Sequence, residues 1–167
     1  MAAGTGRWCK GVGLVMGLGL AALVWAQPVV VHEAWTRASA PGQQTAGVYL
    51  SLTASEAAAL LGASGPTGTQ VELHEMVLDG GVMKMRARAR LALPAGQTVV
   101  LRPGSYHLML HPLRVPLRAG EKLPLTLQVE GRDGQVSRVA VQAEVRGVTA
   151  GRDAAAPEHA AGHAHVH

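Results

Sequence analysis

Residues 71–90 read VELHEMVLDGGVMKMRARAR, which is two short β-like runs joined by Asp79-Gly80-Gly81. Asp-Gly between such runs is a strong signal for a two-residue β-hairpin loop, because a type I′ turn needs positive φ at both of its central residues. The stretch therefore predicts an antiparallel pair of strands, and it sets the class of fold that we expect for the rest of the chain.

The register of this hairpin decides which side chains face each other. A loop at Asp79-Gly80 predicts that Met76 pairs with Met83 and that His74 pairs with Met85, and directly opposed residues share a face of the sheet. A loop one residue later shifts the pairs but keeps the same residues on one face, whereas a three-residue loop breaks the arrangement.

The chain on either side repeats this pattern. From residue 29 to about residue 146, short runs rich in Val, Leu and Thr alternate with Gly- and Pro-containing turns. Many short strands at this spacing predict an all-β domain, an antiparallel barrel or sandwich with Greek-key connections. Residues 54–70 are the exception, since their Glu and Ala residues leave room for a single helical turn before Gly62.

The first 26 residues have the composition of a signal peptide. Two basic residues precede the apolar run Gly11–Trp25, and small residues end at Ala26. We expect cleavage after Ala26 and a periplasmic or otherwise extracytoplasmic protein; a retained N-terminal membrane anchor is the alternative. Cys9 is the single cysteine of the chain and lies in this segment, so the mature protein would have neither a disulfide nor a thiolate. The domain then spans residues 27–146.

Residues 147–167 differ in character, because they are rich in Ala and Gly and have little apolar surface to bury. We expect a flexible tail. Its closely spaced imidazoles are either solvated or form a second metal site that favours Cu(II). The four histidines are His159, His163, His165 and His167.

Charge and composition exclude two classes of function. Lys and Arg number 15 against 11 Asp and Glu, and removing Arg7 and Lys10 with the signal leaves 13 against 11. This near balance, with only three Trp and two Tyr in the whole chain, does not suit nucleic-acid binding. Nothing resembles a nucleophile elbow or a pair of catalytic carboxylates, so we expect no enzyme.

A second stretch, SYHLMLHPL, places His107, Met109 and His111 at every second position. A strand would put these three on one face and the intervening leucines on the other. Together with the hairpin they form a set of imidazoles and thioethers. Thioether sulfur suits Cu(I) and is a poor ligand for Zn²⁺, Mg²⁺ or Ca²⁺, and a blue-copper centre is excluded because it needs cysteine. The opposing interpretation is that methionine fills a core and that the histidines are structural.

The spacing His74, ten residues, Met85, twenty-one residues, His107, one residue, Met109 resembles the H-x10-M-x21-H-x-M signature of the PCuAC family of periplasmic copper chaperones. The flanking GVMKMR, LRPGSYHLML and PLRAGEKLPLTL are similar to that family as well. The resemblance implies a cupredoxin-like barrel and one Cu(I) held by these four residues. Met76, Met83 and His111 are possible auxiliary ligands.

The resemblance also implies partners. Copper would pass to the CuA centre of cytochrome c oxidase, in some members together with a Sco-type protein, and we expect a monomer. Two alternatives stay open at this stage. One is copper sequestration for resistance, with no dedicated acceptor. The other is a metal-free β-sandwich that serves as an interaction module and has a Met/His core.

Overall fold

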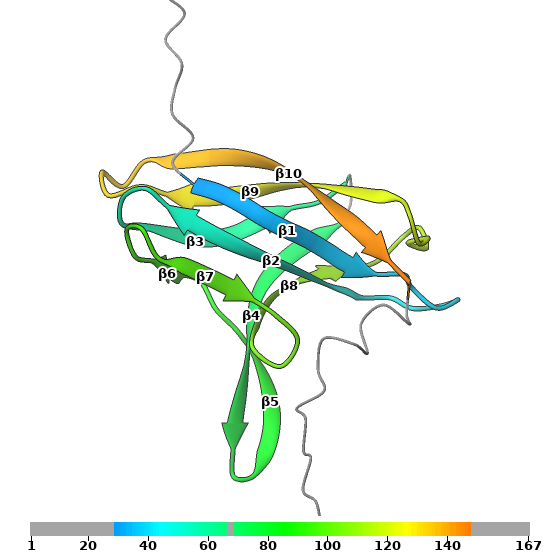
Figure 1. The fold of residues 1–167 in the computed structure, drawn as a ribbon. Coiled ribbons are helices and arrows are strands. Elements are labelled where there is room, and N and C mark those ends of the chain that lie inside the picture. The colour runs from blue at the N-terminus through cyan, green and yellow to red at the C-terminus, as the bar shows by residue number, and fades with distance from the viewer. Residues whose placement is uncertain (1–28, 67–68, 148–167) are drawn as a thin grey trace, which may run out of the picture.

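The computed structural model describes residues 29–66 and 69–147, and all regular elements in these ranges are strands (Figure 1). The prediction of an all-β domain is therefore confirmed. The strands are β1 (Val29–Arg37), β2 (Ala46–Ala54), β3 (Ala58–Ser64), β4 (Gln70–Asp79), β5 (Val82–Ala87), β6 (Leu91–Leu93), β7 (Thr98–Leu101), β8 (Tyr106–His111), β9 (Lys122–Glu130) and β10 (Val136–Arg146).

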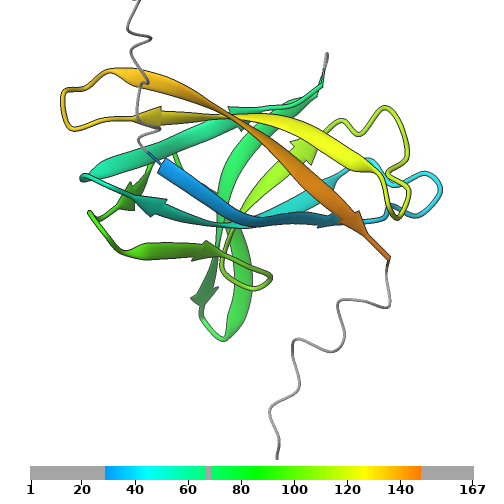
Figure 2. The same cartoon turned by 45° about the horizontal axis from the view of Figure 1, so that its top comes forward.

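Strand pairing closes the sheet into a barrel. Neighbours follow the order β4, β8, β2, β1, β10, β9, β3, and β3 pairs back to β4. Short strands β6 and β7 attach to β3 and β2, and β5 attaches to β4 (Figures 1 and 2). Closure gives each strand of this ring a neighbour on both sides, so open sheet edges remain at the attached strands β5, β6 and β7.

One pair departs from the expected antiparallel arrangement. β1 and β10, the first and last strands, pair in parallel, whereas every other strand pair is antiparallel. Parallel neighbours need a long connection between them, and here the rest of the barrel supplies it. No local turn signal announces such a pairing, so the sequence could not predict it.

The barrel interior is filled by the alternate side chains of each strand. β2 alternates between buried and half-buried positions along its whole length, and Leu108 and Leu110 of β8 are fully buried. The two leucines therefore face the core, as their position between His107, Met109 and His111 predicts. The largest fully buried side chains are Leu50, Leu52, Leu60, Leu73, Leu93, Leu101, Leu108, Leu110, Leu127, Val29, Val48 and Val129.

The structure has a strand, and not the helical turn for which the sequence left room, between residues 54 and 70. Residues Ala58–Ser64 form β3, which pairs with β9 and with β6. Leu60 is fully buried there, so tertiary packing overrides the weak helix preference of the alanines. The run from Val82 to Leu93 divides into the two strands β5 and β6.

A β-bulge in β1 sets the direction of Trp35. The register against β2 shifts between His32 and Trp35, and Glu33 lies at φ 48°. The extra residue reverses the in–out alternation, so that Trp35 pairs with Tyr49 on the outer face of the barrel wall. This explains why the sequence of β1 alternates only in part.

Two predicted segments, the signal peptide 1–26 and most of the histidine tail 147–167, lie outside the described residues. Within residues 29–66 and 69–147 we find no helix with the length and apolar character needed to cross a membrane.

Candidate metal centre

The β4–β5 hairpin turns at Gly80-Gly81, with φ of 62° and 80° at the two glycines. Met76 pairs with Met85 and Leu78 with Met83, one step away from the pairs that an Asp79-Gly80 loop predicts. Those pairs are therefore wrong. The predicted faces are unchanged. Moving the two-residue loop along by one position changes each cross-strand partner by two residues, and residues two apart lie on the same face of a strand.

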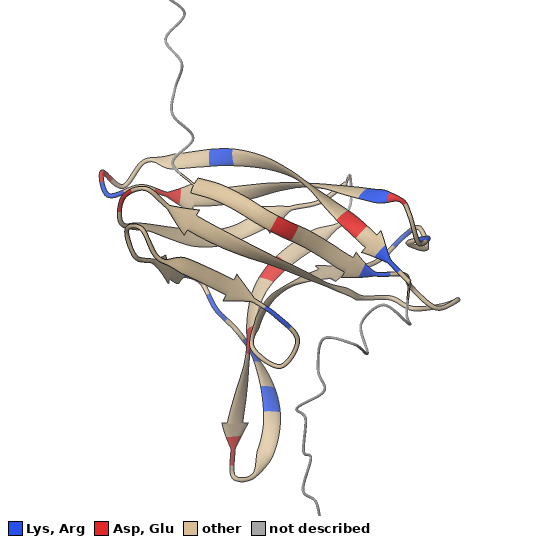
Figure 3. Ribbon diagram, in the orientation of Figure 1, with Lys and Arg blue, Asp and Glu red and all other residues tan. Residues whose placement is uncertain are grey.

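The tip of this hairpin projects from the barrel (Figure 1). Met83 and Met85 are 49% and 48% exposed, and Leu78 is 67% exposed. The hairpin also carries charged residues (Figure 3). By strand alternation they occupy its other face, and there Lys84 and Arg86 both bond to Asp79. Met83 and Met85 therefore do not serve as core filler, which was the opposing interpretation of these two methionines.

Strand β8 brings the downstream residues beside β4. His107 is the cross-strand partner of His74, and Met109 is the partner of Glu72. These two pairs lie on the outer face of the wall, because the leucines between them, Leu73 on β4 and Leu108 on β8, are buried inside the barrel. Met85 joins the same face from β5 through its pairing with Met76. The four predicted ligands thus come from three adjacent strands and share one face.

A close contact within this set joins His107 and Met85. Nε2 of His107 lies 3.2 Å from Sδ of Met85, although 21 residues separate them in the chain. The His74 and His107 rings meet edge to face, with centroids 5.8 Å apart. Two imidazoles and one thioether are therefore adjacent, and Met109 lies two residues from His107 on the same face.

The hydrogen bond of His107 defines its proton position. Nδ1 lies 3.2 Å from the carbonyl oxygen of Ser105, which can only accept, so Nδ1 carries the proton and donates it. Burial lowers the pKa of His107 below its ordinary value, outweighing the opposite effect of this hydrogen bond, and this favours the neutral imidazole. Nε2 then has a free lone pair directed at Met85, which is the form that binds metals.

Glu72 is the residue of this centre that the sequence reasoning missed. Nε2 of His74 donates to Oε2 of Glu72 at 2.9 Å, and Oε1 of Glu72 lies 3.5 Å from Nε2 of His111. These two histidines, His74 first, hold the pKa of Glu72 below its ordinary value. The other ring nitrogen of His74, Nδ1, is buried and has no hydrogen-bond partner.

The predicted auxiliary residues occupy different places. Met76 is half-buried beside Met85, and Met83 lies nearer the hairpin tip, opposite Leu78. His111 ends β8 opposite Gln70 and contacts Glu72. The tail residues His159, His163, His165 and His167 are outside the described part of the chain.

An aromatic wall flanks the centre on the β2 side. The Tyr49 ring lies 6.4 Å from the His107 ring and 4.6 Å from the Trp35 ring, and the Arg146 guanidinium lies over Trp35. Gly47, the cross-strand partner of Met109, makes room for Tyr49, because a Cβ there would lie 2.8 Å from the tyrosine hydroxyl. A side chain at position 47 would displace this ring.

The donor types limit which metal the centre can hold. Among residues 29–66 and 69–147, no three His, Cys, Asp or Glu side chains form a group able to bind a metal ion. A site built from the predicted residues must therefore use methionine sulfur together with two imidazoles. That donor set is soft and neutral, and it suits Cu(I) rather than a hard cation.

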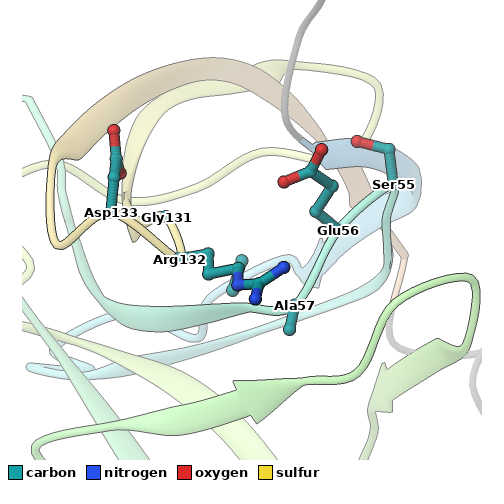
Figure 4. A pocket seen from close by; sticks show the side chains of 7 residues that line it. Ser55, Glu56, Ala57, Gly131, Arg132 and Asp133 are labelled. Carbon is teal, nitrogen blue, oxygen red and sulfur yellow. The ribbon is translucent and has the colours of Figure 1, made fainter.

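A cavity of about 630 Å³ lies elsewhere, between the β2–β3 and β9–β10 turns. Glu56, Arg132 and Asp133 are among its lining residues, and none of the predicted ligands is (Figure 4). The candidate metal centre is therefore an outer face of the barrel wall and is separate from this hollow.

Comparison with known proteins places this domain in a family. The family model described as "Putative lipoprotein LpqE-like" matches residues 29–145. The chain belongs to the LpqE-like family. A relative named "Putative lipoprotein Lxx21020", from Leifsonia xyli subsp. xyli, is 38% identical over 117 residues, which are 70% of this chain and 69% of that protein.

Solved structures show the fold of this LpqE-like domain. The apo PCuAC domain from PmoF1 is similar with a TM-score of 0.59 at 21% identity, over 72% of this chain and 95% of that one. CuI-DR1885 from Deinococcus radiodurans, solved in solution, has a TM-score of 0.54 at 32% identity, over 75% and 83% of the two chains. The predicted cupredoxin-like fold is therefore confirmed.

Proposed function

We propose that this protein is an exported copper chaperone that holds one Cu(I) through His74, Met85, His107 and Met109. The observation that carries the proposal is the 3.2 Å approach of His107 Nε2 to Met85 Sδ. With its proton on Nδ1, His107 offers a lone pair to the same point as the thioether lone pairs. Two atoms that each offer a lone pair gain little from facing each other unless a cation lies between them.

Exposure supports delivery as well as binding. Met85 is 48% exposed on a projecting hairpin, whereas His107 is only 6% exposed. An acceptor can therefore approach the ion from the methionine side and replace the neutral thioether with a stronger anionic ligand, such as a thiolate. We propose the CuA-bearing subunit of cytochrome c oxidase as the acceptor, with or without a Sco-type assembly protein.

Related proteins support both the metal and the location. DR1885, which is similar over most of its length, was solved with Cu(I). The family and the Leifsonia relative are both named as lipoproteins, which agrees with export. We propose that residues 1–26 direct this chain out of the cytoplasm, and that it acts as a binding protein and not as an enzyme. The tail histidines would capture Cu(II) separately.

Copper sequestration without delivery is the second candidate, and the four tail histidines favour it because they would add capacity beyond one ion. The two functions differ in what happens when an acceptor is present. A chaperone releases its ion to that acceptor, whereas a sequestering protein retains it.

Mixing the mature chain, loaded with one equivalent of Cu(I), with the apo CuA domain tests delivery. We expect copper to leave the chaperone under anaerobic conditions and the purple binuclear spectrum to develop after oxidation. Free Cu(I) held by a chelator at the same concentration is the control. Copper that stays on the loaded chain through this mixing would contradict delivery and favour sequestration.

A further inference from the structure

The two ring nitrogen atoms of His74 have different surroundings. Nε2 is hydrogen-bonded to Glu72, whereas Nδ1 is buried and has no partner. A carboxylate can only accept, so in the neutral form of the ring, which is the form that binds metals, the proton is on Nε2 and Nδ1 has the lone pair. A buried acceptor without a partner costs free energy, and an unsatisfied group of this kind needs an explanation.

A metal ion supplies that explanation, because a lone pair that cannot reach water or a protein donor is free for coordination. Metal-ligating histidines commonly donate their other N–H to a carboxylate, which fixes the tautomer and the orientation of the ring. The contact between His74 and Glu72 has this form, with a hydrogen bond of 2.9 Å.

Glu72 is well placed to orient the His74 ring and poorly suited to bind Cu(I) itself. It lies opposite Met109 in the strand pairing, two residues from His74 on the same face of β4. Its oxygen atoms are hard donors, which Cu(I) disfavours beside thioethers. Its second oxygen lies 3.5 Å from His111, so the same carboxylate connects His111 to the centre without metal contact.

We propose that Glu72 is a positioning residue of the copper centre, which fixes the His74 proton on Nε2 so that His74 offers Nδ1 to the metal. This inference rests on the proposed Cu(I) site. His107 has the opposite arrangement, with its proton on Nδ1 and its lone pair on Nε2. The two histidines thus bind through different nitrogen atoms, and a separate oxygen acceptor fixes each of them.

Long-range ¹H–¹⁵N NMR of the apo protein tests the tautomers without any copper. We expect the proton of His74 on Nε2 and that of His107 on Nδ1 in the full mature chain. Glu72→Ala should give a mixture of tautomers at His74 and leave His107 unchanged. A His74 proton on Nδ1 in the wild type, or a tautomer that Glu72→Ala does not alter, would overturn the proposal.

Cu(I) affinity, measured against a competing chelator, tests the consequence. We expect Glu72→Ala to weaken binding roughly 10–100-fold, and Glu72→Gln to restore part of it because an amide oxygen still accepts the hydrogen bond. Glu130→Ala is the matched control, since Glu130 is also a strand carboxylate and pairs with Arg90 away from the centre, and it should leave the affinity unchanged. Wild-type affinity in Glu72→Ala would overturn the role of Glu72.

His74→Ala separates this inference from the proposed function. If that variant binds Cu(I) as tightly as the wild type, the proposed ligand set fails whatever the tautomers are. If it binds weakly while Glu72→Ala binds normally, the ligand set stands and only the role of Glu72 is lost.

Discussion

Replacing Met85 with alanine is expected to weaken Cu(I) binding by roughly 100-fold or more and to leave the stability of the fold nearly unchanged. Mutating a residue that only orients a metal ligand typically lowers metal affinity about 10–100-fold, so removing a ligand itself should lower it by at least about 100-fold. The side chain is 48% exposed, so its truncation should change the free energy of unfolding by only about 0.5 kcal/mol.

Met83→Ala is the matched control for this variant. Met83 lies on the same strand and the same face, is 49% exposed, and pairs with Leu78 near the hairpin tip. Chelator competition and urea unfolding should be run on both variants. Equal losses of Cu(I) affinity in the two variants would mean that the site lies at the hairpin tip. No loss in either variant would mean that the hairpin is not part of the site.

Leu108→Ala is expected to have the largest effect on stability. Leu108 is fully buried between two predicted ligands on β8, and removing a side chain from such a position typically costs about 2–5 kcal/mol. Urea unfolding should show a lower midpoint with an unchanged slope. The outward face of β8 depends on this inward anchor, because a strand that slips by one residue exchanges its two faces.

Val100→Ala provides the comparison, since Val100 is 47% exposed on β7 and its truncation should have a small effect. A loss below about 1 kcal/mol for Leu108→Ala would mean that the leucines of β8 are not part of the core. His107 and Met109 would then face the interior, contrary to the arrangement on which the metal centre depends.

The parts of the centre that local sequence could predict all rest on the two-residue period of a strand. Asp79-Gly80-Gly81 located the hairpin, and the alternation in SYHLMLHPL placed His107 and Met109 opposite Leu108. The exact loop was wrong by one residue, because Asp-Gly and Gly-Gly both satisfy a type I′ turn. The predicted faces were still right, because the different loop changes each cross-strand partner by two residues.

The parts that the sequence could not predict depend on contacts between distant segments. Glu72 reads as an ordinary exposed carboxylate until β4 pairs with β8 and places it beside His111. The parallel β1–β10 pair and the strand at residues 58–64 likewise follow from closure of the barrel. The direction of Trp35 depends on one extra residue in a bulge, which no simple alternation reveals.

X-ray absorption at the copper edge tests the central claim most directly, because it counts the sulfur atoms bound to the ion. The full mature chain with one equivalent of Cu(I) should give two sulfur and two nitrogen neighbours, from Met85, Met109, His74 and His107. Met85→Ala should give one sulfur neighbour. A wild-type spectrum with nitrogen and oxygen neighbours alone would contradict the account and move the copper away from this face of the barrel.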